Sequence, residues 1–131
     1  MTEPAEHAAR RNFSIAVDFD GVIHEYVSPW IDAETIPDPP VPGAIEWLNE
    51  MREKFRIVVF TTRGKTETGR IAVATWLVAR GYPAVPDDVT AEKPPALIYL
   101  DDRAVRFDGT NFPTADQIHR DFVPWNKRKK R

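Results

Sequence analysis

The chain has 131 residues and a net charge of −2, and it contains no cysteine. This length allows one domain with an ordinary hydrophobic core, while the missing cysteine excludes disulfides, thiolate zinc sites and a cysteine nucleophile. No apolar run approaches a membrane span and no secretory signal opens the chain, so we expect a cytoplasmic protein without a membrane partner.

Both ends of the chain are predicted to lie outside the domain, which we expect over residues 12–125. Residues 1–11 are polar and rich in alanine, which is typical of a mobile arm. Five of the 18 Lys and Arg residues occupy positions 127–131, and they predict a basic C-terminal tail over 126–131. Such a tail is either a solvated terminus or an electrostatic attachment to nucleic acid.

The domain is predicted to begin with a buried strand. Residues 13–18 form an apolar run with β-branched members, as in a central strand covered on both faces. Five prolines between residues 22 and 42 exclude a helix and predict an extended flap. Pro42 suits the first turn of a helix, which should lead to a second buried strand over 55–60.

A loop over residues 61–66 should follow, and then a helix that ends at Gly81. Ile71, Ala74, Thr75 and Val78 recur at helical spacing and are expected on one face of this helix. A third buried strand is predicted over 96–100. Thr114 is expected to cap a last helix over 115–121.

Strands that alternate with helices predict an α/β fold, here a Rossmann-like three-layer sandwich with a central, mostly parallel sheet and helices on both faces. Ligands bind such sheets beyond the carboxyl ends of the strands. Each apolar run ends in residues capable of chemistry: Asp18 and Asp20, then Thr61, Thr62 and Arg63, then Asp101 and Asp102. We therefore expect these three groups to converge at one edge.

The pair Asp18 and Asp20 is the most informative feature of the chain. Two carboxylates this close stay ionised only if a cation shares them, or else one carries a proton. The pair therefore indicates a hard-metal site, an acid/base pair, or both. Oxygen ligands alone favour Mg²⁺ over Zn²⁺. The cations Lys93 and Arg63 and the Thr61 hydroxyl suit the oxygens of a phosphoryl group.

The order of these residues resembles the four signature motifs of the haloacid dehalogenase superfamily of phosphotransferases. The motifs are Asp-Phe-Asp-Gly-Val, a strand ending in threonine, Lys93, and a strand ending in Asp-Asp, and they span residues 13–102. The resemblance implies a magnesium-dependent phosphatase that forms an aspartyl-phosphate. The sequence Thr-Thr-Arg-Gly at 61–64 is also similar to the phosphate-contacting turn of polynucleotide 3′-phosphatases in this superfamily.

The resemblance implies a role for each acidic residue. Asp18 would be the nucleophile and a magnesium ligand. Asp20 would be the general acid and then the general base, with its backbone carbonyl on the metal. Asp101 would complete the metal site, and Asp102 would be a second ligand or a brace.

The resemblance also implies the phosphate contacts. Thr61 and Lys93 would act on the phosphoryl group, and Thr62 and Arg63 would bind the substrate. Each has an alternative interpretation, because a threonine can simply end a strand, and a lysine or arginine here can be a surface residue that pairs with a carboxylate. His24 is interpreted as a loop histidine, and Asp38, Asp87 and Asp88 as turn residues.

Neither interval between the motifs is predicted to fold as a cap domain, so the resemblance implies a capless member with an open site. Such members tend to act on macromolecules or to borrow a cap by oligomerising. Tyr26, Trp30 and Ile31 lie in the flap, where an aromatic ring could stack on a nucleobase or pack against the prolines. A nucleotide or nucleic acid phosphate end is the expected substrate, with a phosphoprotein or a small phosphomonoester as alternatives.

Other acidic sites fit the sequence less well. An EF-hand that begins at Ala16 has Gly21 at its sixth position but Val27, not glutamate, at its twelfth. Receiver domains place their acid pair before the threonine and lysine, whereas here an acid pair follows Lys93, which argues against a phosphoacceptor domain without removing it. A non-enzymatic module that binds magnesium or nucleic acid stays a second hypothesis.

Overall fold

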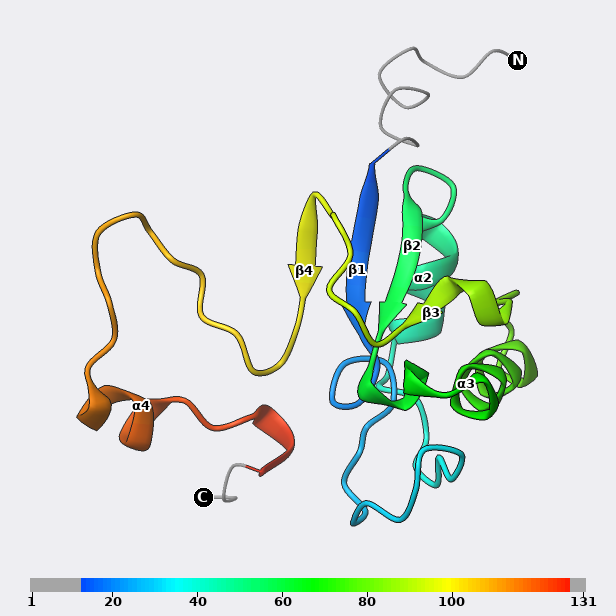
Figure 1. Ribbon diagram of the computed structural model, residues 1–131, viewed down its shortest axis with the longest axis horizontal. Helices are drawn as coiled ribbons and strands as arrows, with labels where there is room; N and C mark the ends of the chain where they lie inside the picture. Colours follow the sequence, from blue (N-terminus) through cyan, green and yellow to red (C-terminus); the bar gives the residue numbers. More distant parts are fainter. Residues whose placement is uncertain (1–12, 128–131) are drawn as a thin grey trace.

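The computed structural model describes residues 13–127, so the expected arm over 1–11 and the last four residues of the basic tail lie outside the described residues. Its centre is a four-stranded parallel sheet in the order β3-β2-β1-β4 (Figure 1). The strands are β1 (Ser14–Asp18), β2 (Arg56–Phe60), β3 (Val89–Thr90) and β4 (Ile98–Leu100). The predicted α/β fold with a parallel sheet is confirmed, and the short strand β3 is an element that the sequence did not indicate.

The helices of the described chain are α2 (Ala44–Met51), α3 (Glu67–Ala79) and α4 (Ala115–Asp121), with 3₁₀ turns η1 (Thr62–Lys65), η2 (Pro86–Asp88) and η3 (Trp125–Lys127). The cap of α4 is confirmed. The Thr114 hydroxyl accepts from the Gln117 N–H, and the Gln117 side chain accepts from the Thr114 N–H. The expected start of α2 is wrong, because its N-cap is Gly43 and Pro42 lies outside the helix.

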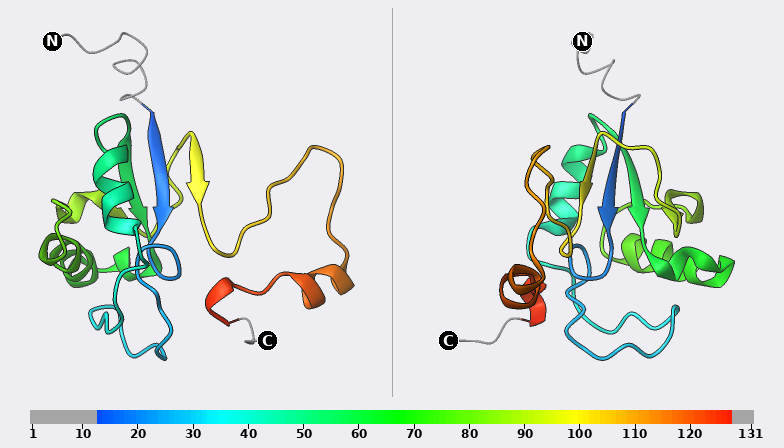
Figure 2. Two further views of the ribbon diagram at one scale, coloured as in Figure 1. Left: turned by 180° about the vertical axis from the view of Figure 1, so that it is seen from behind. Right: turned by 60° about the vertical axis from the view of Figure 1, so that its left-hand side comes forward.

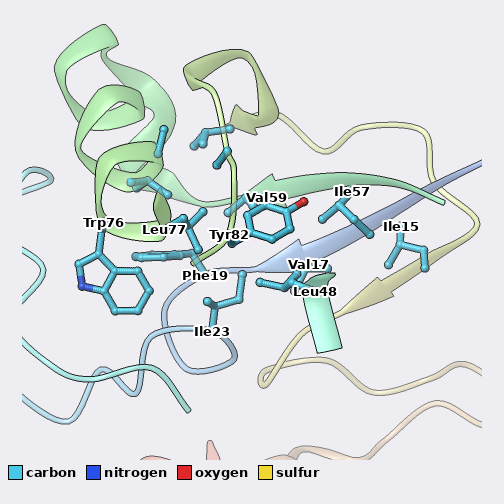
Figure 3. Close-up of a cluster of buried hydrophobic side chains, with 14 residues drawn as sticks. Ile15, Val17, Phe19, Ile23, Leu48, Ile57, Val59, Trp76, Leu77 and Tyr82 are labelled. Carbon is cyan, nitrogen blue, oxygen red and sulfur yellow. The ribbon is translucent and has the colours of Figure 1, made fainter. Parts of the chain in front are cut away.

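The hydrophobic core lies against the face of the sheet that carries Val17 and Val59. Leu48 from α2 and Leu77 from α3 pack into the same cluster (Figure 3). Phe19, which follows β1 directly, is fully buried in this cluster. The core therefore fixes the chain immediately before and after Asp18.

The face of α3 on which Ile71, Ala74, Thr75 and Val78 were expected is buried only at Ala74. Val73, Trp76 and Leu77 are buried, whereas Ile71 and Val78 are exposed. The helix carries apolar residues around most of its circumference, so two sets of side chains satisfy helical spacing. The contacts of α3 with β3, η1 and η2 decide which set is buried.

The opposite face of the sheet is open. Ala16, Phe60 and Tyr99 line a hollow of about 730 Å³ there. The prediction that β4 is buried is wrong, because β4 pairs only with β1 within the described chain and all three of its residues are exposed. The chain then runs away from the sheet through α4, which lies apart from it in every view (Figures 1 and 2).

The C-terminal end of the described chain comes back to the start of the domain. The Trp125 indole N–H donates to the Gly21 carbonyl, and the Lys127 ammonium lies 5.4 Å from the centre of the Tyr26 ring. Within the described residues, no helix is long and apolar enough to span a membrane.

Candidate active site

The register of the sheet brings three strand ends together. Asp18 is paired with Phe60, so Thr61 follows next to it. On the other side of β1, Val17 is paired with Leu100, so Asp101 lies beside Asp18. The expected convergence at the carboxyl edge of the sheet follows directly from this parallel pairing.

Three carboxylates form a cluster at this edge. Asp18, Asp101 and Asp102 each offer one oxygen, and these oxygens all lie within 4.8 Å of one another. The Oδ1 atom of Asp102 is buried and has no hydrogen-bond partner among residues 13–127. A buried carboxylate oxygen without a partner is costly, so a cation or water bound here would be stabilised.

Gly21 allows Asp102 to come this close. Its φ is +92°, a value that L side chains rarely adopt, and an added Cβ would lie 2.3 Å from the Asp102 Oδ2 atom. The backbone of the first motif and the carboxylate of the last motif are therefore in direct contact only because position 21 has no side chain.

The charge of the cluster favours a cation. Burial raises the pKa of Asp18 to about 8, and a hydrogen bond with Asp102 and the negative charges of Asp101, Asp102 and Asp20 act in the same direction. A divalent ion among these oxygens would offset both the repulsion and the loss of hydration. Oxygen-only donors suit magnesium, so Asp18, Asp101 and Asp102 fit the ligand set of a magnesium ion.

The Asp20 side chain is not part of this cluster. Its Oδ1 lies 2.8 Å from Nδ1 of His24, and Nε of Arg63 donates to Oδ2 at 2.9 Å and to Oδ1 at 3.2 Å. The two aspartates of the first motif thus have different partners. Asp18 faces other acids, whereas Asp20 pairs with a guanidinium.

Arg63 is almost completely buried, with 1% of its surface exposed. Its Nη1 donates to the carbonyl oxygens of Asp32, Ala33 and Thr35 in the flap. The Trp30 ring covers its guanidinium, with a centroid distance of 4.5 Å. Arg63 therefore joins Asp20 to the flap, and the expected contact with a substrate stays a prediction.

The threonines after β2 are in different environments. Thr61 is 3% exposed, and its Oγ1 accepts from the Arg63 N–H at 3.2 Å. No acceptor for its own hydroxyl hydrogen is found among the described residues, so this hydrogen could be donated to a ligand. Thr62 is exposed at the start of η1.

Lys93 lines the same hollow as Asp18 and Asp101. Its ammonium lies 4.6 Å from the centre of the Tyr99 ring. No salt bridge joins it to an acidic residue within the part of the chain that the structure describes. The structure therefore brings Lys93 to the same hollow as the acids, on the open face of the sheet.

His24 and Asp38 are the site residues that the sequence missed. His24 is fully buried, and its Nε2 accepts from the Asp38 N–H at 3.0 Å. Asp38 is also buried, and its carboxylate accepts from the N–H groups of Val27 and Ser28 and from the Ser28 hydroxyl. The interpretation of these residues as ordinary loop and turn positions is therefore incomplete, and the spacing of His24 four residues after Asp20 was the one available signal.

No protein-family model, curated protein or solved structure matches this chain. The interpretation of the site therefore depends on its own geometry. That geometry consists of three acids whose oxygens lie within 4.8 Å of one another, a fourth acid held separately, and a lysine and a threonine hydroxyl at the same sheet edge.

Proposed function

We propose that this protein is a magnesium-dependent phosphomonoester hydrolase that acts through an aspartyl-phosphate on Asp18. The observation that carries the proposal is the separation of the two aspartates of the first motif. Asp18 lies with Asp101 and Asp102 in a cluster that fits a cation, while Asp20 is held outside it by Arg63. A nucleophile next to a metal and a separate acid/base group are the two parts that such a reaction needs.

The reaction would proceed in two displacements. An Asp18 oxygen attacks phosphorus, the bond from phosphorus to the leaving oxygen breaks, and Asp20 donates a proton to that oxygen. Water then attacks phosphorus, Asp20 takes back a proton from it, and the bond to Asp18 breaks to release phosphate. Bound magnesium would supply positive charge next to the phosphoryl oxygens.

Two further side chains would act on the phosphoryl group. The Thr61 hydroxyl, at the edge of the sheet, has no acceptor for its hydrogen within the described chain. Lys93 would extend from the hollow and neutralise charge as it develops on the phosphoryl oxygens. Thr62, which is exposed at the start of η1, would contact the substrate beside them.

The finer parts of the proposal are the absence of a cap domain, a cytoplasmic location, and a nucleotide or nucleic acid phosphate end as the substrate. A Rossmann-like three-layer sandwich would in addition need a helix over the open face of the sheet, on the side of Ala16 and Phe60. The absence of a cap is supported by the intervals between motifs: residues 22–42 contain neither helix nor strand, and residues 66–92 contain only α3, η2 and β3. The substrate class is supported by Trp30, which is 48% exposed at the flap beside Arg63.

The test is hydrolysis of an aryl phosphate by the purified protein. We expect phosphate release with magnesium, no release after chelation, and none from Asp18→Asn. Asp87→Asn is the matched control, since it removes an exposed carboxylate that lines a different hollow from Asp18 and Asp101, and it should retain full activity. Hydrolysis that survives Asp18→Asn would exclude the proposed nucleophile.

Mass spectrometry of the acid-quenched protein tests the intermediate. A phosphoryl group on the peptide that contains Asp18, together with turnover, would support the two-step reaction. A phosphoryl group that accumulates there without turnover would instead indicate a receiver-like phosphoacceptor.

A further inference from the structure

His24 is a buried histidine in which both ring nitrogens have partners. Nδ1 lies 2.8 Å from the Oδ1 atom of Asp20, and Nε2 lies 3.0 Å from the backbone nitrogen of Asp38. A backbone N–H can only donate, so Nε2 must accept and carries no proton. The ring proton is therefore on Nδ1, and it is donated to Asp20.

The surroundings of His24 prevent the ring from changing its orientation. Phe19 stacks against it at 5.6 Å with an interplanar angle of 20°, and Trp76 meets it edge-on at 5.6 Å. The His24 N–H donates to the Phe19 carbonyl, and the His24 carbonyl accepts from the Gly21 N–H. The turn that contains Asp20 and the ring that contacts Asp20 are thus one rigid unit.

We propose that His24 is a positioning residue for Asp20, a role that rests on the proposed function. Arg63 reaches both oxygens of the Asp20 carboxylate, but through the single donor atom Nε. The hydrogen bond from His24 to Oδ1 supplies the second fixed point. With both donors present, the oxygen that handles the proton is held at one position relative to the leaving group.

A purely structural role makes a different prediction. His24 also accepts from the Asp38 N–H, and Asp38 closes the flap through its hydrogen bonds with Ser28. If the ring served only to anchor the flap, the bond at Nε2 would be important and the bond at Nδ1 would not. Variants that keep the hydrogen bond of only one ring nitrogen therefore distinguish positioning of Asp20 from anchoring of the flap.

The experiment compares His24→Asn with His24→Gln. The asparagine amide can occupy the place of Nδ1 and keep the donation to Asp20, whereas the glutamine amide can occupy the place of Nε2 and keep the acceptor for the Asp38 N–H. We expect His24→Asn to retain kcat for aryl phosphate within about threefold and His24→Gln to lose about tenfold or more, with little change in KM. The reverse order would overturn the inference and support flap anchoring.

Ser28→Ala is the matched control for the flap. It removes the hydroxyl that donates to Asp38 and leaves both contacts of the histidine ring in place, so kcat should stay close to that of the unchanged protein. A loss of kcat in Ser28→Ala equal to that in His24→Gln would contradict the positioning role. Absence of hydrolysis by the unchanged protein would remove both the proposed function and this inference.

If neither His24 variant folds, the position of the ring proton can still be measured in the unchanged protein. Long-range ¹H–¹⁵N NMR spectra of its histidines report which ring nitrogen carries the proton. The proton is expected on Nδ1 of His24, and a proton found on Nε2 would overturn the inference whatever the activity.

Discussion

Replacement of Gly21 by alanine gives the sharpest test of the acid cluster. The new Cβ would lie 2.3 Å from Oδ2 and 2.7 Å from Cγ of Asp102. Non-bonded atoms prefer separations near 3.5 Å, so the Asp102 carboxylate must retreat by about 1 Å. Metal ligation tolerates only a few tenths of an ångström, and we therefore expect Gly21→Ala to lose most of its magnesium binding.

Alanine at position 21 also introduces backbone strain, and the effect of this strain must be distinguished from the effect of the contact with Asp102. A left-handed conformation costs an ordinary L residue roughly 1–2 kcal/mol. Gly43 provides the matched control, because its φ is +86° and no atom lies within 4 Å of an added Cβ. Gly43→Ala should therefore show the strain alone and keep its response to magnesium.

Thermal unfolding with a chelator and with excess magnesium is a suitable assay. A ligand at 100 times its Kd stabilises the folded state by about 2.7 kcal/mol, which should raise the melting temperature of the unchanged protein and of Gly43→Ala by roughly 10 °C. Gly21→Ala should show little of this increase. An increase in Gly21→Ala as large as that in Gly43→Ala would refute the metal site as described.

Three further predictions test the core, the flap and the phosphate contact. Leu77→Ala should lower the free energy of unfolding by about 2–5 kcal/mol. Val78→Ala, at an exposed position, should change it by no more than about 0.5 kcal/mol. Equal effects of the two variants in urea denaturation would contradict the assigned buried face of α3. Burial opposes the charge on Asp38, but hydrogen bonds from Ser28 and Val27 outweigh it and lower the pKa of Asp38 below its ordinary value of 3.8. The stability that this carboxylate contributes is therefore present above pH 3.8 and lost as the pH falls below it. The difference in the free energy of unfolding between the unchanged protein and Asp38→Asn should therefore shrink in acid. A difference that grows in acid would contradict the assignment. Lys93→Met should abolish hydrolysis of aryl phosphate and leave the melting temperature nearly unchanged, since Lys93 is exposed; full activity would exclude it from the site.

Local signals in the sequence were sufficient for most elements. The apolar runs before Asp18 and Thr61 and the cap at Thr114 are determined by neighbouring residues, and each appears within two residues of its predicted position. The meeting of the strand ends also follows from local information, because parallel strands place their carboxyl ends at one edge.

Burial was harder to predict because it depends on contacts between distant segments. The spacing of Ile71 and Val78 is as helical as that of Val73 and Leu77, and only packing against β3, η1 and η2 selects the second pair. The run over 96–100 is apolar enough for a central strand, yet its position at the edge of the sheet leaves it exposed.

The network around Asp20 could not be predicted from spacing. Arg63 reaches carbonyl oxygens about thirty residues earlier in the chain, and His24 contacts a backbone N–H fourteen residues later. Such contacts exist only once the flap has adopted its path. The sequence supplied the residue types, and the course of the flap determined their partners.

The anchoring of the flap affects how the site would receive a ligand. The carboxylate of Asp38 closes the chain onto Ser28, and Arg63 holds the carbonyl oxygens of Asp32 and Thr35. The conformational entropy of this segment is therefore already lost when the domain folds. A ligand that contacts the flap would bind to a preorganised surface, and its affinity would not be reduced by the entropic cost of ordering a loop.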